Sequence, residues 1–110
     1  MIIKMLMEIM LDEKKCEEYN VNIYECYNII DRYFHIQGIK IVGQGFYSGT
    51  HFRDKGFKIF ALSICRFPKL FWFIKCAKKW NLYTNNCVKD YLFIYKKRKN
   101  MKECKNFEKF

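Results

Sequence analysis

Three polar side chains that could support catalysis lie close together in the segment GQGFYSGTHFRDKG, residues 43–56. His51 could act as a general base, and Arg53 could hold a phosphate, with Asp54 beside them. A small toxin-like ribonuclease would use such parts. The same residues are common in surface turns, where Asp-Lys-Gly is ordinary turn chemistry. The sequence therefore favours a structural role for this segment, and ribonuclease activity ranks third among the functions considered.

The glycines of this segment miss the known nucleotide-binding fingerprints. Gly43, Gly45 and Gly49 follow the spacing G-x-G-x-x-x-G, whereas a dinucleotide fingerprint needs G-x-G-x-x-G between a strand and a helix. No P-loop lysine follows, and the kinase motifs H-R-D and D-F-G are missing. We expect Gly43 and Gly45 to permit a β-bulge or close packing, and Gly49 and Gly56 to bracket a turn.

The cysteines do not have the spacing of a metal site. They lie at positions 16, 26, 65, 76, 87 and 104. No two are separated by two to four residues, and neither His35 nor His51 has a cysteine near it in sequence. The cysteines fall inside apolar periodic segments, where a free thiol behaves as a small buried hydrophobe. We therefore expect reduced thiols in a cytoplasmic protein, with no metal and no cofactor.

The start of the chain does not resemble a secretory signal. MIIKMLMEIML is apolar, but no small-residue cleavage site precedes DEKK. The apolar runs at 1–11 and 57–74 are interrupted by charge or proline, which argues against a membrane span. The sequence predicts a soluble protein that does not bind a membrane.

Positive charge is concentrated in the second half of the chain. The net charge is +10, with 21 lysines and arginines against 11 acidic residues. Residues 1–54 have a small acidic excess, and residues 55–110 contain all of the excess positive charge. This distribution indicates an anionic partner for the second half, such as nucleic acid or an acidic protein face.

Basic and aromatic residues of this half form the main candidate binding set. It consists of Lys75, Lys78, Lys79, Lys89, Lys96, Lys97, Arg98 and Lys99, with Trp72 and Tyr83 as the exposed rings. Lysines neutralise phosphates, and rings can stack on unpaired bases. A secondary candidate surface on the glycine-rich segment consists of Tyr47, His51, Phe52 and Arg53.

Periodicity predicts a small α+β domain over residues 1–99, with helices packed on a short hairpin-based antiparallel sheet. Residues 22–37 form the clearest helix: Asn22 caps it, a buried face follows at helical spacing, and Gly38 ends it. Residues 39–47 and 56–64 are predicted strands, joined by a longer loop. Helices are predicted at 69–80 and 87–98, and residues 100–110 form a basic, frayed tail.

The first eleven residues fit a buried strand or a short helix equally well, so the predicted order is roughly α-β-β-α-α. A third strand from 1–11 or 80–84 would stabilise the hairpin. Of the rings, those at 73, 80 and 91 are expected in the core.

Three functions are consistent with these features. The first is a non-enzymatic interaction protein that binds a larger protein or ribonucleoprotein complex handling nucleic acid, as phage anti-CRISPR and other anti-defence inhibitors do. The second is direct RNA or DNA binding through the basic C-terminal helices. The third is the ribonuclease. The sequence does not specify an oligomeric state, and a homodimer stays open.

Overall fold

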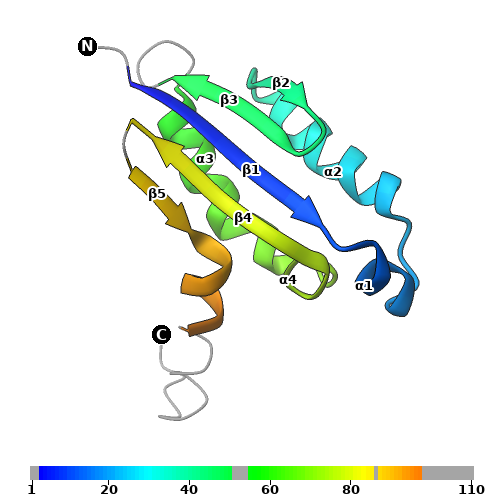
Figure 1. Ribbon diagram of the computed structural model, residues 1–110. Helices are drawn as coiled ribbons and strands as arrows, with labels where there is room; N and C mark the ends of the chain where they lie inside the picture. Colours follow the sequence, from blue (N-terminus) through cyan, green and yellow to red (C-terminus); the bar gives the residue numbers. More distant parts are fainter. Residues whose placement is uncertain (1–2, 51–54, 86, 98–110) are drawn as a thin grey trace.

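The structure is a computed structural model that describes residues 3–50, 55–85 and 87–97. Its elements follow one another along the chain (Figure 1). They are β1 Lys4–Leu11, α1 Glu13–Glu18, α2 Ile23–Ile36, β2 Lys40–Gly43, β3 Phe46–Thr50, α3 Gly56–Arg66, η1 Phe67–Lys69, α4 Phe73–Cys76, β4 Ala77–Thr84 and β5 Cys87–Asp90. Residues 91–97 are helical after β5. The predicted α+β class is confirmed.

The five strands form one antiparallel sheet in the order β2-β3-β1-β4-β5. The first four strands have the order and directions of the β-α-β-β-α-β, ferredoxin-like arrangement, and β5 extends the sheet beyond β4 as a hairpin. Residues 4–11 therefore form the central strand β1. One third strand was expected, from 1–11 or from 80–84, and the structure has a strand in each segment, β1 and β4, side by side.

The helices cover one face of this sheet (Figure 1). On β1, Met5, Met7, Ile9 and Leu11 point to that face and are buried in the core. Their neighbours on the flanking strands are also buried: Tyr47 lies opposite Met7, and Trp80 lies opposite Ile9. The opposite side, which we call the open face, carries the alternate residues of each strand. No helix of the described residues covers it.

The predicted helix at 22–37 is confirmed as α2. The Asn22 side-chain oxygen accepts hydrogen bonds from the backbone N–H groups of Tyr24 and Glu25, which satisfies two orphan donors of the first turn. Gly38 follows the helix with φ +85°, as expected of a left-handed C-terminal stop. Cys26, Tyr27, Ile30 and Phe34 form its buried face. This element was predictable because its cap, stop and period agree.

The predicted strand at 56–64 is wrong, because these residues begin α3. The buried residues Gly56, Ile59, Phe60 and Ser63 follow the helical spacing i, i+3, i+4, i+7. The helical period was hidden by a serine at the last buried position. The Ser63 hydroxyl donates to the Phe60 carbonyl at 2.7 Å and so does not need a partner outside the helix. Most outward residues of α3 are apolar as well, so its sequence resembles that of a central strand, which is apolar on both faces.

The hairpin turn also lies elsewhere than predicted. β2 and β3 are joined through Gln44 and Gly45, so residues 46–50 form a strand and not a loop. The pairing slips between Ile41 and Gly43, which confirms the expected bulge. Gly49 does not bracket a turn. A Cβ there would lie 3.3 Å from Gly56 Cα, so the glycine allows α3 to begin against β3.

The predicted helix at 69–80 is wrong over most of its length. Only the single turn α4 is helical, and β4 starts at Ala77. A β-bulge opposite Met10 and Leu11 explains the error. Because the bulge inserts one residue, Ala77 and Trp80 both point into the core while the two lysines between them are exposed. Buried residues three apart then imitate a helical period.

The predicted helix at 87–98 begins later than expected. Residues 87–90 form the edge strand β5, and its Val88 is exposed instead of facing inward. The Asp90 carboxylate accepts a hydrogen bond from the Phe93 N–H at 3.0 Å, so it caps the helical residues 91–97. Within that helix, Leu92 is buried and Tyr91 and Tyr95 are half-buried, in agreement with the predicted inward face.

Candidate binding surfaces

The predicted basic residues lie on four different elements and not on two successive helices. Lys75 ends α4, Lys78 and Lys79 lie at the start of β4, and Lys89 lies on β5. Lys96 and Lys97 lie on the helix at 91–97. All six are exposed, and Arg98 and Lys99 lie outside the described residues. The Lys75 ammonium lies 5.0 Å from the centre of the Tyr19 ring, a cation–π contact that ties it to the region after α1.

The two rings expected at the surface behave differently. Trp72 is only 4% exposed, so its prediction as a binding ring is wrong. The turn before α4 places the Trp72 ring 5.9 Å from that of Phe73, inside the core. Tyr83 is half-buried on the open face of β4, and its hydroxyl donates to a Glu8 carboxylate oxygen at 2.7 Å. This bond raises the pKa of Tyr83.

The secondary surface on the glycine-rich segment is corrected for Tyr47. Its side chain is fully buried on the core face of β3, and its ring centre lies 4.5 Å from that of Phe34. The hydroxyl donates to the Asp31 carboxylate of α2 at 2.5 Å. Burial, reinforced by this bond, raises the pKa of Tyr47. The other members of this predicted surface, His51, Phe52 and Arg53, lie outside the described residues, as does Asp54.

Acidic and basic side chains are unevenly distributed over the fold. α1 and α2 contain Glu13, Glu17, Glu18, Glu25 and Asp31. These helices lie toward the β2 side and the end of β1, whereas β5 and the helix at 91–97 lie at the opposite edge (Figure 1). The described residues from 55 to 97 contain ten lysines and arginines and one acidic residue, Asp90. The charge asymmetry of the sequence is therefore kept only in part, since Lys14, Lys15 and Arg32 lie on α1 and α2 themselves and Lys75 of α4 lies against Tyr19.

The outward side of α3 forms an apolar surface. It carries Phe57, Ala61, Leu62 and Cys65, all of them exposed; Lys58 lies among them at helical spacing, and Arg66 lies at one margin. The inward side of the same helix packs its ring and aliphatic side chains against the sheet. We call these four residues the α3 surface.

Three cysteines are gathered in the core between α1, α2 and α4. The Cys16 thiol lies beside those of Cys26 and Cys76, and all three are buried. Burial, together with the neighbouring Cys16 thiol, raises the pKa of Cys26 to about 11 and that of Cys76 to about 12. Within the described part of the chain, no group of three metal-ligating side chains has a geometry suited to a metal ion. High pKa values make these two thiols poor nucleophiles and suit them to packing.

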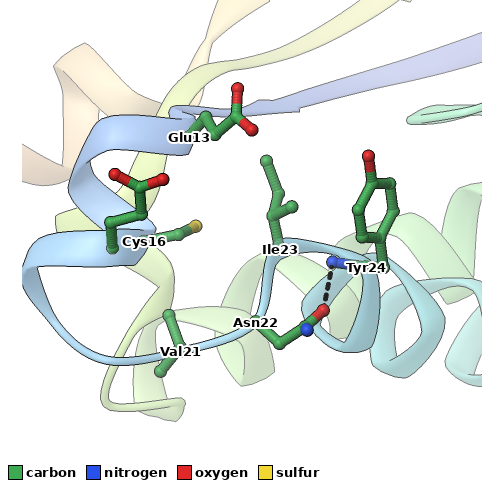
Figure 2. A pocket seen from close by; sticks show the side chains of 7 residues that line it. Glu13, Cys16, Val21, Asn22, Ile23 and Tyr24 are labelled. Atoms are coloured by element: carbon green, nitrogen blue, oxygen red, sulfur yellow. Dashed lines mark hydrogen bonds between the residues drawn. The ribbon is translucent and has the colours of Figure 1, made fainter.

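A hollow of about 220 Å³ lies between α1 and the start of α2 (Figure 2). It is lined by Glu13, Cys16, Glu17, Val21, Asn22, Ile23 and Tyr24. Asn22 among them is already engaged as the cap of α2. The hollow thus combines two acidic side chains with mostly apolar ones, and its amide side chain serves the fold.

Two surfaces were missed by sequence reasoning, the α3 surface and the site around Glu8 on the open face. The signal for the second was present in KMLMEIML, where Lys4 and Glu8 fall on one side of an alternating strand. The first was missed because its apolar residues were assigned to a strand core.

Comparisons with protein-family models, curated proteins and solved structures gave no match. Among the described residues, no helix combines the length and the apolar character that crossing a lipid bilayer requires. The function is therefore inferred from the surfaces of this chain.

Proposed function

We propose that this chain is a non-enzymatic interaction protein that binds a larger protein through the α3 surface. A helix that is apolar on all sides is normally buried on all sides. Apart from Lys58, Ser63 and Arg66, α3 has that composition, but the sheet of the described domain covers only its inward side, and Leu62 remains 42% exposed. Contiguous exposed apolar residues commonly mark protein contacts. This apolar outward side is the observation that carries the proposal.

The charges near the α3 surface suggest the kind of partner. Lys58 lies within the surface, Arg66 lies at its margin and Lys69 follows in η1, so a complementary surface is apolar with acidic side chains opposite these three. Enzymes that act on nucleic acid hold their divalent cations with carboxylates and bind phosphates in basic grooves. The basic side chains of residues 55–97 complement such carboxylates, and the acidic side chains of α1 and α2 complement a basic groove. We therefore propose an inhibitor of a nucleic-acid-handling protein, of the anti-CRISPR or anti-defence kind.

Among the described residues, two cysteines are exposed, and they allow a matched cross-linking test. Cys65 lies on the α3 surface, whereas Cys87 lies on the edge strand β5. A photoreactive maleimide is attached to Cys65 in a variant with Cys87→Ser and Cys104→Ser, or to Cys87 in a variant with Cys65→Ser and Cys104→Ser. Each labelled variant is irradiated in an extract of the native host. The proposal expects one protein to be captured from Cys65 and not from Cys87. Its purified form should bind nucleic acid and lose activity when the wild-type chain is added.

Binding of that purified protein is then measured with Leu62→Asp and, as control, with Val88→Asp on exposed β5. We expect Leu62→Asp to weaken binding at least tenfold, since an ionised carboxylate is costly to bury in an apolar interface. Equal affinities for the two variants would refute the docking role of the α3 surface. A dimer of the pure protein that only Leu62→Asp dissociates would assign this surface to a second copy of the chain, against the proposal.

Direct binding of single-stranded nucleic acid is the second candidate function. It is favoured by the ten basic residues against one acidic residue in the described part of 55–97. Gel shifts with mixed RNA and DNA at two salt concentrations test it, because phosphate contacts release counterions and weaken steeply with salt. A lack of any shift at low salt would refute it. For both functions we place the protein in the cytoplasm, where its free thiols would stay reduced.

A further inference from the structure

The open face has a carboxylate near its centre. Glu8 lies on the central strand β1 between Met7 and Ile9, which point to the core, so its own side chain lies on the open face. It is nevertheless only 7% exposed, because side chains of the neighbouring strands crowd around it. Burying an ionised carboxylate is costly unless hydrogen bonds compensate it. A group held in this way is positioned for a defined contact.

The hydrogen bonds of Glu8 involve only one of its two oxygens. Oε1 accepts from the Tyr83 hydroxyl at 2.7 Å and from Asn81 Nδ2 at 3.3 Å. Within the described residues, Oε2 accepts no hydrogen bond and Glu8 forms no ion pair. The two bonds fix the orientation of the carboxylate and leave Oε2 as an acceptor on the open face.

Two rings lie on either side of this acceptor. The strand pairing places Phe46 of β3 directly opposite Glu8, and Tyr83 of β4 opposite Leu6, one step diagonally from Glu8. Both rings are half-buried, and their outer parts are accessible. Neighbouring strands lie about 4.8 Å apart, so rings and carboxylate fall within the span of one or two stacked bases.

Lysines surround the rings on the same face. Lys4 pairs with Thr50, Lys40 pairs with Ser48, and Lys79 pairs with Met10, all in open-face positions. The β4 bulge adds Lys78 beside Lys79. The four ammonium groups are exposed. The open face thus combines a cationic periphery with two rings and one buried acceptor.

We propose that the open face binds single-stranded nucleic acid and that Glu8 Oε2 accepts hydrogen bonds from the base edge of a guanine. This inference rests on the second candidate function. Proteins that read single strands lay the bases on aromatic side chains and contact their edges with polar groups. The lysines around the rings attract phosphates and repel a cationic peptide, so charge complementarity favours a nucleic acid as the occupant.

Guanine is the base whose edge fits a carboxylate best. Its N1–H and N2–H donors are adjacent and can both point at one carboxylate. Adenine and cytosine place a ring acceptor next to their amino donor, and uracil flanks its single N–H with two carbonyl oxygens. Each of these acceptors would repel the carboxylate. The lysines supply affinity without regard to sequence, and Glu8 supplies the base preference.

The test uses fluorescence anisotropy with three labelled octaribonucleotides: all-uridine, uridine with one central guanosine, and the same with inosine, which lacks the N2 amino group. For the wild type we expect roughly tenfold tighter binding of the guanosine oligonucleotide than of the all-uridine one, within the range of a bidentate base contact. Inosine should give an intermediate affinity. Glu8→Gln should bind the all-uridine oligonucleotide as well as the wild type or better, with less than twofold preference for guanosine.

Two control variants separate base recognition from structural effects. Tyr83→Phe removes one bond to Oε1 but keeps the ring and Oε2, so the guanosine preference should persist. Lys79→Ala should weaken binding of all three oligonucleotides by the same factor and reduce the salt dependence. Thermal unfolding establishes that each variant is folded at the assay temperature.

The outcomes distinguish the site from the function. If the folded wild type binds no oligonucleotide at low salt, direct nucleic-acid binding is refuted together with this site. Binding with equal affinity for uridine and guanosine strands would overturn the assignment of Glu8 and leave the function standing. A guanosine preference that survives Glu8→Gln would also overturn it. If instead Glu8→Gln weakens binding of the cross-linked protein partner and no oligonucleotide binds, a cation of that partner occupies the site.

Discussion

Replacing Gly45 by alanine should destabilise the fold far more than replacing Gly38, although both glycines have left-handed backbones. Their φ values are +81° and +85°. A Cβ on Gly38 would meet nothing within 4 Å, whereas a Cβ on Gly45 would lie 2.2 Å from the Ile9 carbonyl oxygen of β1. The pair therefore separates the cost of the backbone conformation from the cost of close approach.

The magnitudes follow from these two contributions. A left-handed conformation costs a non-glycine residue about 1–2 kcal/mol, reduced by about 0.5 kcal/mol because alanine also restricts the unfolded chain. Gly38→Ala should therefore lower the free energy of unfolding by about 1 kcal/mol. Gly45→Ala must also move the turn away from β1, which breaks the 2.8 Å hydrogen bond from the Ile9 N–H to the Gly45 carbonyl. A buried backbone group left unpaired costs a further ~1–3 kcal/mol, so the total is about 2–4 kcal/mol.

Urea unfolding followed by far-UV circular dichroism measures both values. For a domain of this size, a loss of about 2–4 kcal/mol is a large part of a total stability of roughly 5–15 kcal/mol. Gly45→Ala should therefore unfold at a much lower urea midpoint, with a slope like that of the wild type. Equal midpoints for the two variants would refute the close approach of the Gln44–Gly45 turn to β1.

Two further predictions concern buried polar groups. Tyr47→Phe should lower the free energy of unfolding by about 1–2 kcal/mol, because it leaves the Asp31 carboxylate without its hydrogen-bond donor; Tyr24→Phe, on an exposed ring, should leave the urea midpoint unchanged. Stability should fall as the pH rises above about 9. The folded-state pKa values of the Cys26 and Cys76 thiols are raised from 9.0 to about 11 and about 12. The contribution of these thiols to stability is therefore fully present below pH 9 and is lost as the pH rises toward 11 and 12. Urea midpoints at pH 8, 9 and 10 measure how steeply stability falls with pH. Cys26→Ala should make this fall less steep, and an unchanged pH dependence in that variant would contradict the role of the Cys26 thiol.

Local signals predicted α2 correctly because everything that defines this helix lies within it. Asn22, the apolar positions and Gly38 act over a few residues, and they agree with one another. The same local method failed at α3 and β4. In α3 a buried serine broke the apolar period, and in β4 a bulge gave a strand the spacing of a helix. Neither signal can be interpreted without the neighbouring strand.

The predicted site residues also divide into those that composition identifies and those whose role depends on packing. The exposed lysines were found from composition, because long charged side chains are rarely buried. The burial of Trp72 and Tyr47 depends on which elements pack over them, and that is not a local property. The importance of Glu8 depends on Asn81 and Tyr83, which lie more than 70 residues away along the chain.

The sequence by itself determined the α+β class, the capped helix α2, the charge asymmetry of the two halves and the need for glycine at a bulged turn. These are properties of composition and of short-range periodicity, which act within a few residues. Only the tertiary structure decided that β1 is the central strand, that the chain turns at Gln44 and Gly45 into β3 while Gly56 begins a helix, and that no helix of the described residues covers the sheet face around Glu8. Strand order and register are set by pairing between distant segments and by which faces must be buried together, so they exist only once the chain has folded.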